Sequence, residues 1–271
     1  MPELPEVETV VNDLRPALAG LTFQNISGEW EKMVNPAFAA FKKIKNQKVL
    51  NVARRGKFIV ILMENGKVIT LHLRMSGRIL VRKSEDCALP YERVRLDFDK
   101  ASLRFCDIRK FGKIWLSDIE NYESLSGIDK LGPEPLAENF GVESFAEAIE
   151  GQKGAIKRVL LDQTVIAGIG NIYADESLFY AGILPDREVS GLSVVEIEKL
   201  FEGIVAALKQ GIRNRGTSIS DYADAYGKTG RNQELLKVYG RGGEKCMHCE
   251  NILTKVKLVG RGTVFCSNCQ K

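Results

Sequence analysis

The sequence of 271 residues is 44% apolar and 27% charged, which is typical of a globular protein with room for two domains. It contains no apolar stretch long enough to cross a membrane. The net charge of +4 is uneven, because residues 241–271 hold six Lys and Arg against two Asp and Glu. Such a basic C-terminal segment is typical of a phosphate-binding module, although it would also suit an acidic protein.

The first residues place a proline and two acids at the start of the chain. Removal of Met1 would leave the secondary amine of Pro2 at the N-terminus, and a terminal amine titrates at about 7.7–8. An unprotonated amine attacks electrophilic carbon and forms an iminium, and Glu3 and Glu6 are near enough in sequence for proton transfer. The alternative is an ordinary helix start, where proline and acids are common in the first turn.

A helix followed by strands is predicted for the first half of the chain. The helix covers roughly Glu6 to Leu18, and residues 48–116 have the pattern of strands, with a tight-turn signal at Asn65-Gly66. The clearest strands are 49–54, 58–63, 68–73, 93–98 and 103–106. This pattern indicates a β-sandwich or a flattened barrel.

Beyond a Gly- and Pro-rich link at 126–141, the pattern becomes helical. Ser193 and Glu196 form a capping box, and the apolar stripe that follows continues to Ile212. We assign that stripe to the core and give it no function.

Two shorter helices are expected within 156–184, joined by a turn that contains Gly168 and Gly170. Asn171 is expected to cap the second of them. The free N–H groups and the positive dipole end of such a helix start suit a phosphate. A plain connector between packed helices is the alternative.

The C-terminal segment contains two CxxC pairs with sixteen residues between them, a spacing typical of a four-thiolate zinc site. The four candidate ligands are Cys246, Cys249, Cys266 and Cys269. The stretch 251–265 suits a β-hairpin with its tip at 260–262. A redox motif would need only one pair, and disulfides would need an oxidising compartment, which no signal peptide indicates. Cys87 and Cys106 are expected to be buried thiols.

Together, the opening Pro-Glu-Leu-Pro-Glu, the glycine–asparagine helix turn and the four-cysteine hairpin resemble the formamidopyrimidine-DNA glycosylase family. The resemblance covers essentially the full chain and implies an α+β fold in two domains. One is an N-terminal β-sandwich with flanking helices, and the other is a helical domain with a helix–two-turn–helix and a zinc β-hairpin. The expected boundaries are 1–130 for the catalytic sandwich, 131–240 for the helical domain with its lesion loop, and 241–271 for the zinc hairpin.

This resemblance implies a bifunctional enzyme of base excision repair. It would excise oxidised purines, such as formamidopyrimidines and 8-oxoguanine opposite cytosine, and cut the strand by β,δ-elimination. Pro2 is the expected nucleophile at the anomeric carbon, Glu3 the acid at the sugar ring oxygen, and Glu6 a positioning or proton-transfer group. Lys57 matches the family's lysine that contacts the phosphate beside the lesion.

A base inside a duplex must be extruded before it can react, and the gap must then be filled. Met75, Arg109 and Phe111 match the family residues that enter this gap and pair with the orphaned base. Without the resemblance, Met75 and Phe111 would be assigned to strand core and Arg109 to a surface ion pair. The other DNA contacts that the resemblance implies are His72, Asn171 and Arg261.

One segment departs from the family, because Tyr91-Glu92-Arg93 stands where a His-Asp-His run is common. Arg93 is the expected replacement for the histidine contact with a phosphate. The Ser-, Thr- and Gly-rich run 217–230 resembles the loop that closes over the flipped base. Its composition also indicates a mobile loop.

Two alternatives stay open. A non-catalytic zinc ribbon that binds nucleic acid explains 241–271 but makes no use of the opening residues or Lys57. The same chemistry on oxidised pyrimidines is disfavoured by Leu4, since the endonuclease VIII group typically has glycine there. We expect one structural Zn²⁺, a monomer acting on double-stranded DNA with no membrane partner, and a bacterial cytoplasmic location.

Overall fold

The computed structural model describes residues 1–219 and 221–271, which form two compact units. The first unit comprises Met1–Lys130 with Asn214–Gln233, and the second comprises Leu131–Arg213 with Glu234–Lys271. Residues 214–233 therefore group with the N-terminal part of the chain, whereas we expected them in the helical domain 131–240. None of the helices that the structure describes is long and apolar enough to cross a membrane.

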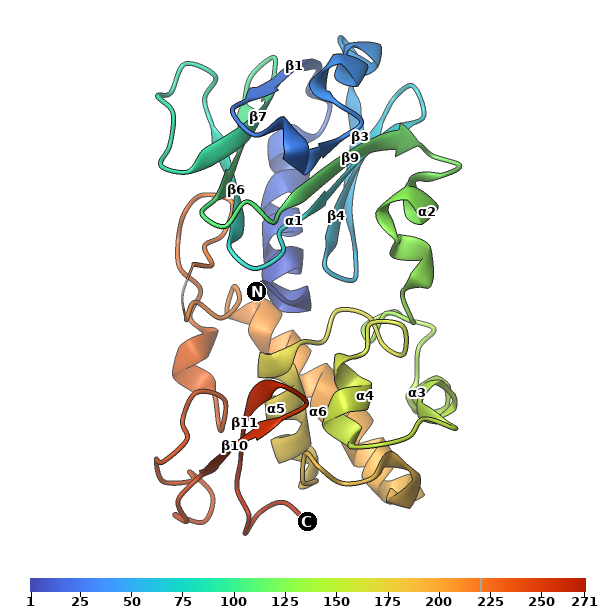
Figure 1. Cartoon of the computed structure of the whole chain (residues 1–271), viewed down its shortest axis with the longest axis vertical. Helices are drawn as coiled ribbons and strands as arrows, with labels where there is room; N and C mark the ends of the chain where they lie inside the picture. Colours follow the sequence, from blue (N-terminus) through green and yellow to red (C-terminus); the bar gives the residue numbers. More distant parts are fainter. Residues whose placement is uncertain (220) are drawn as a thin grey trace. The chain divides into compact units, whose positions relative to one another are not determined.

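The first unit is built mainly of strands (Figure 1). The strands are β1 (Phe23–Gly28), β2 (Val34–Asn35), β3 (Val49–Arg55), β4 (Phe58–Met63), β5 (Lys67–His72), β6 (Gly77–Arg82), β7 (Glu92–Phe98), β8 (Ser102–Asp107) and β9 (Lys113–Asp118). One sheet has the order β1-β7-β8-β6, and the other has the order β2-β9-β5-β4-β3. All described pairs are antiparallel except β2 with β9.

Helix α1 (Leu4–Leu18) contacts both sheets, because it packs against β3, β4 and β6. Its side chains Val7, Val10 and Leu14 are buried in one apolar cluster that also contains Ile59 of β4 and Ile79 of β6. The start of α1 is thereby fixed against the sandwich. This unit further contains α2 (Tyr122–Ser126) and short 3₁₀ helices at Glu31–Met33, Phe38–Ile44 and Ile128–Lys130.

The second unit is mainly helical and carries a hairpin. Its elements are α3 (Val142–Ile149), α4 (Ile156–Leu161), α5 (Asn171–Ala181), α6 (Val194–Arg213), β10 (Thr254–Leu258) and β11 (Arg261–Phe265), with a 3₁₀ helix at Val189–Gly191 and another at Asn232–Leu235 that begins in the first unit. Helix α5 is central, since it packs against α4, α6 and β11 (Figure 1). The α+β fold with its sandwich, helical part and cysteine hairpin is as predicted.

The capping box of α6 is present, because Glu196 N donates to Ser193 Oγ at 3.3 Å and Ser193 N donates to Glu196 Oε2 at 2.8 Å. The predicted cap of α5 was wrong by one residue. Gly170 is the N-cap, with an extended backbone, and Asn171 is the first helical residue. The side-chain amide of Asn171 donates instead to Gly262 O at 2.9 Å.

Two further details differ from the sequence prediction. Leu258 pairs with Arg261, so the tip of the hairpin is Val259-Gly260 rather than 260–262. Both tip residues have positive φ, 51° and 72°, as a two-residue hairpin turn of the right twist requires. Cys106 is buried as expected, but Cys87 is exposed.

Candidate active site and metal centre

The N-terminal segment is buried at the start of α1. Pro2 precedes the helix and is buried, and the side chains of Glu3 and Glu6 are also buried. Glu6 Oε2 accepts a hydrogen bond from Glu3 N at 2.8 Å, and Glu6 Oε1 accepts one from Thr217 N at 2.8 Å. Both oxygens of Glu6 are therefore engaged with backbone N–H groups, which favours the positioning role over proton transfer.

Lys57 lies in the two-residue turn between β3 and β4, where Arg55 pairs with Phe58. The lysine is buried. Arg54 orders this turn, because its Nη1 donates to Gly56 O at 3.1 Å and its Nε forms an ion pair with Glu8 of α1 at 2.6 Å. The turn that carries Lys57 is thus attached to the helix whose N-terminus carries Pro2 and Glu3.

Arg109 contacts two other predicted DNA-contacting side chains, Met75 and Phe111. Arg109 Nη1 lies 3.2 Å from Met75 Sδ, and the Arg109 guanidinium lies 4.8 Å from the centre of the Phe111 ring. Met75 and Phe111 are 42% and 50% exposed, which is far from the strand-core alternative. An exposed thioether, guanidinium and ring in contact form a projection able to stack against bases.

A buried aspartate organises this projection. Asp107 Oδ1 accepts hydrogen bonds from Ser76 Oγ at 2.6 Å and from Arg109 N at 3.1 Å, and its Oδ2 accepts one from Gly112 N at 2.8 Å. Ser76 directly follows Met75, so Asp107 joins the loop after β5 to the loop after β8. Sequence reasoning missed this role, although a buried acid before a turn is a known organiser of backbone N–H groups.

His72 is buried at the end of β5 and is held neutral. Its Nδ1 accepts a hydrogen bond from Arg74 N at 2.9 Å, and its ring lies edge-on to Phe58 at 4.5 Å between centroids. Burial lowers the pKa of His72 to about 3, with smaller contributions from the charges of Arg74 and Lys57. Because Nδ1 is the acceptor, the ring proton belongs on Nε2, which leaves a neutral donor.

The guanidinium of Arg93 is already bonded within the first unit. Its Nε donates to Asp107 O at 2.9 Å, its Nη1 forms an ion pair with Glu29, and it lies 5.7 Å from the centre of the Tyr91 ring. A phosphate contact by Arg93 therefore stays a prediction, and Glu29 would compete for the guanidinium.

In the second unit, Gln163 shapes the turn before α5. Its Nε2 donates to Ile169 O at 2.8 Å, and its Oε1 accepts from Gly168 N at 3.0 Å. The Asn171 side chain bonds to Gly262 O of the hairpin, as described above. Its Oδ1 is buried and has no hydrogen-bond partner among the residues that the structure describes. Asn171 and the strand of Arg261 are thereby brought together.

A buried ion pair attaches the hairpin to the helices. Lys157 of α4 and Asp175 of α5 are almost completely buried, with Nζ and Oδ1 2.5 Å apart. Lys157 Nζ also donates to Thr263 Oγ1 at 2.8 Å, and Asp175 Oδ2 accepts from Val264 N at 3.1 Å. Burial raises the pKa of Asp175 to about 6, and Lys157 opposes that rise. Arg261 itself is exposed beside the tip.

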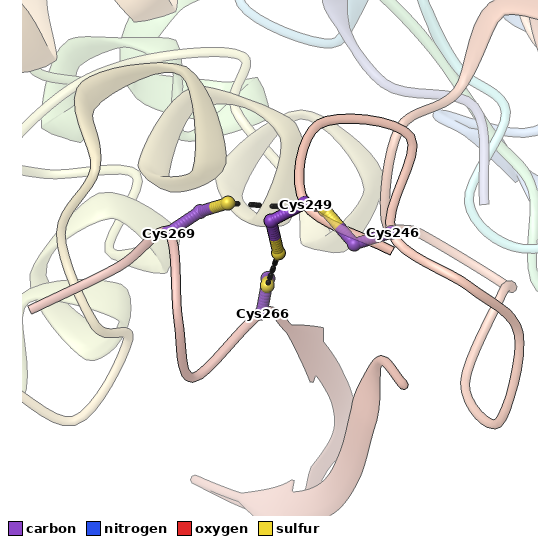
Figure 2. Close-up of side chains that lie close together, drawn as sticks. All are labelled: Cys246, Cys249, Cys266 and Cys269. Carbon is purple, nitrogen blue, oxygen red and sulfur yellow. Dashed lines mark hydrogen bonds between the residues drawn. The ribbon is translucent and has the colours of Figure 1, made fainter. Parts of the chain in front are cut away.

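The four predicted cysteine ligands converge at the base of the hairpin, as Figure 2 shows. Their sulfur atoms all lie within 4.8 Å of one another, with Cys249 and Cys266 3.4 Å apart and Cys246 and Cys269 3.9 Å apart. Zinc–thiolate bonds of about 2.3 Å in a tetrahedron place sulfur atoms about 3.8 Å apart. The residues present therefore fit one structural zinc ion, with no position left for water.

The predicted site residues divide between the two units. The first unit holds Pro2, Glu3, Glu6, Lys57, His72, Met75, Arg93, Arg109 and Phe111. The second holds Asn171, Arg261 and the four cysteines. Ser220 of the predicted lesion loop lies outside the described residues, and the rest of that loop is anchored by hydrogen bonds such as Thr217 N to Glu6.

Comparison with known proteins finds the family that the sequence resembles in three successive segments of the chain. Residues 1–114 match the formamidopyrimidine-DNA glycosylase N-terminal domain, 131–223 match the H2TH domain of that enzyme, and 243–271 match the zinc finger found in FPG and IleRS. Formamidopyrimidine-DNA glycosylases of Pelotomaculum thermopropionicum and Desulfitobacterium hafniense are 40% and 41% identical to this chain. Each alignment covers 100% of this chain, and 99% and 100% of the two relatives.

Solved structures agree with the sequence comparison. Wild-type Lactococcus lactis Fpg in complex with DNA containing N7-benzyl-Fapy-dG has a TM-score of 0.92 and 35% identity, and the match covers 100% of both chains. Lactococcus lactis Fpg in complex with DNA containing an abasic site also has a TM-score of 0.92 and 35% identity, over 99% of both chains.

Proposed function

Because the chain belongs to the formamidopyrimidine-DNA glycosylase family, we propose that it excises oxidised purines from double-stranded DNA and then cuts the strand at the abasic site. The observation that carries this proposal is the buried N-terminal group of Pro2, Glu3 and Glu6, held by hydrogen bonds at the start of α1. The Lactococcus lactis relatives are complexed with DNA that carries a formamidopyrimidine or an abasic site, which supports the same substrates here.

The first step displaces the damaged base. After removal of Met1, the lone pair of the Pro2 nitrogen attacks C1′ of the deoxyribose, and the glycosidic bond breaks with its electrons going to the base, which takes up a proton. The nitrogen then loses its proton, and its lone pair expels the ring oxygen O4′. Glu3 donates a proton to O4′ as the ring opens. The product is an iminium that joins Pro2 to C1′.

The iminium then allows the strand to be cut. It acidifies the C2′ hydrogen, so removal of that proton expels the phosphate on the 3′ side in a β-elimination. A second, δ-elimination expels the phosphate on the 5′ side. Water then hydrolyses the iminium and releases Pro2. Glu6 holds the segment in place through its bonds to Glu3 N and Thr217 N throughout these steps.

Extrusion of the base leaves a gap that the exposed projection of Met75, Arg109 and Phe111 is suited to fill. Unstacking costs a few kcal/mol, which contacts in the gap offset. The preformed contacts between Arg109 and its two neighbours reduce the ordering required on binding. Arg109 is the expected partner of the orphaned base, which is cytosine for an 8-oxoguanine lesion.

The remaining cationic and polar residues are assigned to the DNA backbone. Lys57 and neutral His72 in the first unit, and Asn171 and Arg261 in the second, would bind phosphates and so fix register rather than sequence choice. Zinc, when bound by the four cysteines, supplies structural support for the hairpin that carries Arg261. We further expect the protein to be a monomer and to act in the bacterial cytoplasm. Sedimentation of the protein alone and with one duplex measures its oligomeric state.

Borohydride trapping tests the nucleophile directly. The protein is incubated with a duplex containing 8-oxoguanine opposite cytosine, reduced, digested and mapped by mass spectrometry. An adduct on an N-terminal peptide that starts at Pro2 is the expected result. Binding without an adduct or a cut would favour the non-catalytic zinc-ribbon alternative. Faster cutting of duplexes with oxidised pyrimidines would favour the endonuclease VIII alternative.

Pro2→Gly provides the matched variant. It replaces the rigid secondary amine while leaving Glu3, Glu6 and the DNA-contacting residues in place. Strand cutting should fall by at least about 100-fold, in the range typical of an impaired nucleophile, whereas affinity for the lesion duplex should stay within about twofold. Full cutting activity in this variant would contradict the assignment of Pro2.

A further inference from the structure

Arg215 joins two buried acids that are distant in the sequence. Its Nη2 donates to both carboxylate oxygens of Asp13 at 2.9 and 2.7 Å, and to Asp224 Oδ2 at 2.5 Å. Its Nε donates to the same Asp224 oxygen at 3.2 Å. Asp13 belongs to α1, and Asp224 belongs to the loop 217–230, so one guanidinium connects the loop to the helix that begins beside Pro2.

The two acids are otherwise oriented by backbone N–H groups of the loop. Asp13 Oδ2 accepts from Ala225 N at 3.3 Å, and Asp224 Oδ1 accepts from Tyr226 N and Lys228 N at 3.0 and 2.9 Å. Asp13 and Asp224 are only 8% and 1% exposed. Without Arg215, two desolvated carboxylates would face each other with no cation between them, and their repulsion would push the loop away from α1.

The backbone at this position indicates that the side chain matters. Arg215 has φ +58°, in the left-handed region where glycine is favoured, and the next residue, Gly216, has φ +83°. A non-glycine residue is strained there, and the ion pairs of the guanidinium offset that strain. Arg215→Gly therefore removes the guanidinium without adding backbone strain at a left-handed position.

The neck of the loop, residues 214–218 with 230–233, is closed independently of Arg215. Arg231 N donates to Asn214 O at 2.8 Å, and Asn232 N donates to Gly216 O at 3.1 Å. The two sides are so close that a Cβ on Gly230 would lie 2.0 Å from Gly216 O. Loss of Arg215 would thus remove the ion pairs between the loop and α1 without opening the neck, and would leave Ala225 N as the remaining described hydrogen-bond partner of Asp13 in the loop.

We propose that Arg215 is a positioning residue for base excision, which holds the part of the loop around Asp224 against α1 through Asp13 and Asp224. This inference rests on the proposed function, in which that loop covers the flipped base. The loop starts beside the reacting residues, because Thr217 N binds the same Glu6 carboxylate that binds Glu3 N. Thr217 belongs to the neck, so this bond stays in place when Arg215 is lost. A loop held in this way would contact the flipped base of an intact nucleotide. An abasic site has no base, so the loop makes no such contact there.

Two substrates separate this role from a direct contact with DNA. In single turnovers, Arg215→Gly should slow excision of 8-oxoguanine about 10- to 100-fold, as expected when a positioning group shifts by about 1 Å. The rate of cutting of a duplex with a preformed abasic site should stay within about twofold of wild type, because that duplex has no base for the loop to contact. Arg215→Lys keeps the positive charge but lacks the planar guanidinium that binds both acids. Its excision rate should lie between those of Arg215→Gly and the wild type.

Lys100→Gly is the matched control, because it removes one positive charge from an exposed turn of the same unit. It should leave both reactions and the loop unchanged. Hydrogen exchange on the DNA-free proteins gives a readout that does not depend on activity. Amides of peptides from 217–230 should exchange faster in Arg215→Gly, while those of α1 keep the wild-type rate.

Equal losses on both duplexes would overturn the proposal and assign Arg215 to phosphate binding. Unchanged excision together with unchanged exchange would overturn it as well. Failure of the wild-type protein to cut either duplex would remove the proposed function instead, and the exchange experiment would still decide whether Arg215 holds the loop.

Discussion

Replacement of His72 by asparagine should make the first unit less sensitive to acid. The reference pKa of histidine is about 6.5 in an unfolded chain, whereas burial lowers that of His72 to about 3 in the folded protein. Below pH 6.5 the unfolded chain takes up a proton that the folded chain does not. The free energy of unfolding therefore decreases as the pH falls below 6.5, and it continues to decrease down to about pH 3.

The size of the effect follows from these two pKa values. At pH 5, which is about 1.5 units below the unfolded pKa, His72 lowers the free energy of unfolding by about 2 kcal/mol. An asparagine side chain does not titrate, and its Oδ1 is able to accept the hydrogen bond that Arg74 N now donates to the ring. The His72→Asn variant should therefore lose about 2 kcal/mol less than the wild type between pH 7.5 and pH 5.

Tryptophan fluorescence during urea unfolding is the suitable assay. The chain has two tryptophans, Trp30 and Trp115, and both lie in the first unit with His72. The other histidine, His248, lies in the second unit and does not affect this signal directly. Parallel loss of stability in wild type and variant would show that His72 is protonated in the folded protein and would refute the reasoning.

Three further predictions concern the second unit. Cys249→Ser should abolish zinc binding, measured by atomic absorption, and weaken duplex affinity at least about tenfold, because the hairpin loses its metal; unchanged affinity without zinc would contradict this. Val259→Asn should stabilise the hairpin by about 0.5–1 kcal/mol, since Asn with Gly260 is the favoured pair for a turn with two positive φ angles. Slower hydrogen exchange in β10 and β11 is the expected result, and faster exchange would count against it. Asp175→Asn should cost about 3–5 kcal/mol in urea unfolding, because it leaves Lys157 charged and buried. The double change Lys157→Met with Asp175→Leu should cost less than the single one, and a larger cost would show that the ion pair is a net stabilising contact.

Local signals in the sequence were sufficient for much of the architecture. The Ser193–Glu196 capping box, the Asn65-Gly66 turn and the spacing of the cysteines each depend on residues close together in the chain, and the structure contains all three. Strand β1 was missed because Phe23–Gly28 has little apolar alternation and lies at the edge of its sheet. The exposure of Cys87 depends on tertiary packing, which no local pattern reports.

The contacts that organise the site were beyond local patterns. Glu6 and Thr217 are separated by 211 residues, and Asp13 and Arg215 by 202. Each of these acids also suits an ordinary exposed helix position, so the sequence alone gave no reason to assign it a distant partner. Asp107 is similar, because its binding of Ser76 depends on the pairing of β6 with β8. The resemblance predicts which residues act in the reaction, and the structure shows which contacts hold those residues.

The discontinuous first unit has a consequence for how the protein is made. Residues 1–130 leave the ribosome first, but Thr217 N donates to Glu6, and Arg215 and Ala225 N donate to Asp13 of α1. Until those residues emerge, Asp13 lacks the guanidinium that compensates its burial, and Glu6 has only one of its two backbone donors, Glu3 N. The sheets are able to assemble early, whereas the N-terminal amine and its acids reach their final arrangement only when most of the chain has been synthesised. A fragment ending at Lys130 should accordingly fold as a sandwich with a frayed first helix.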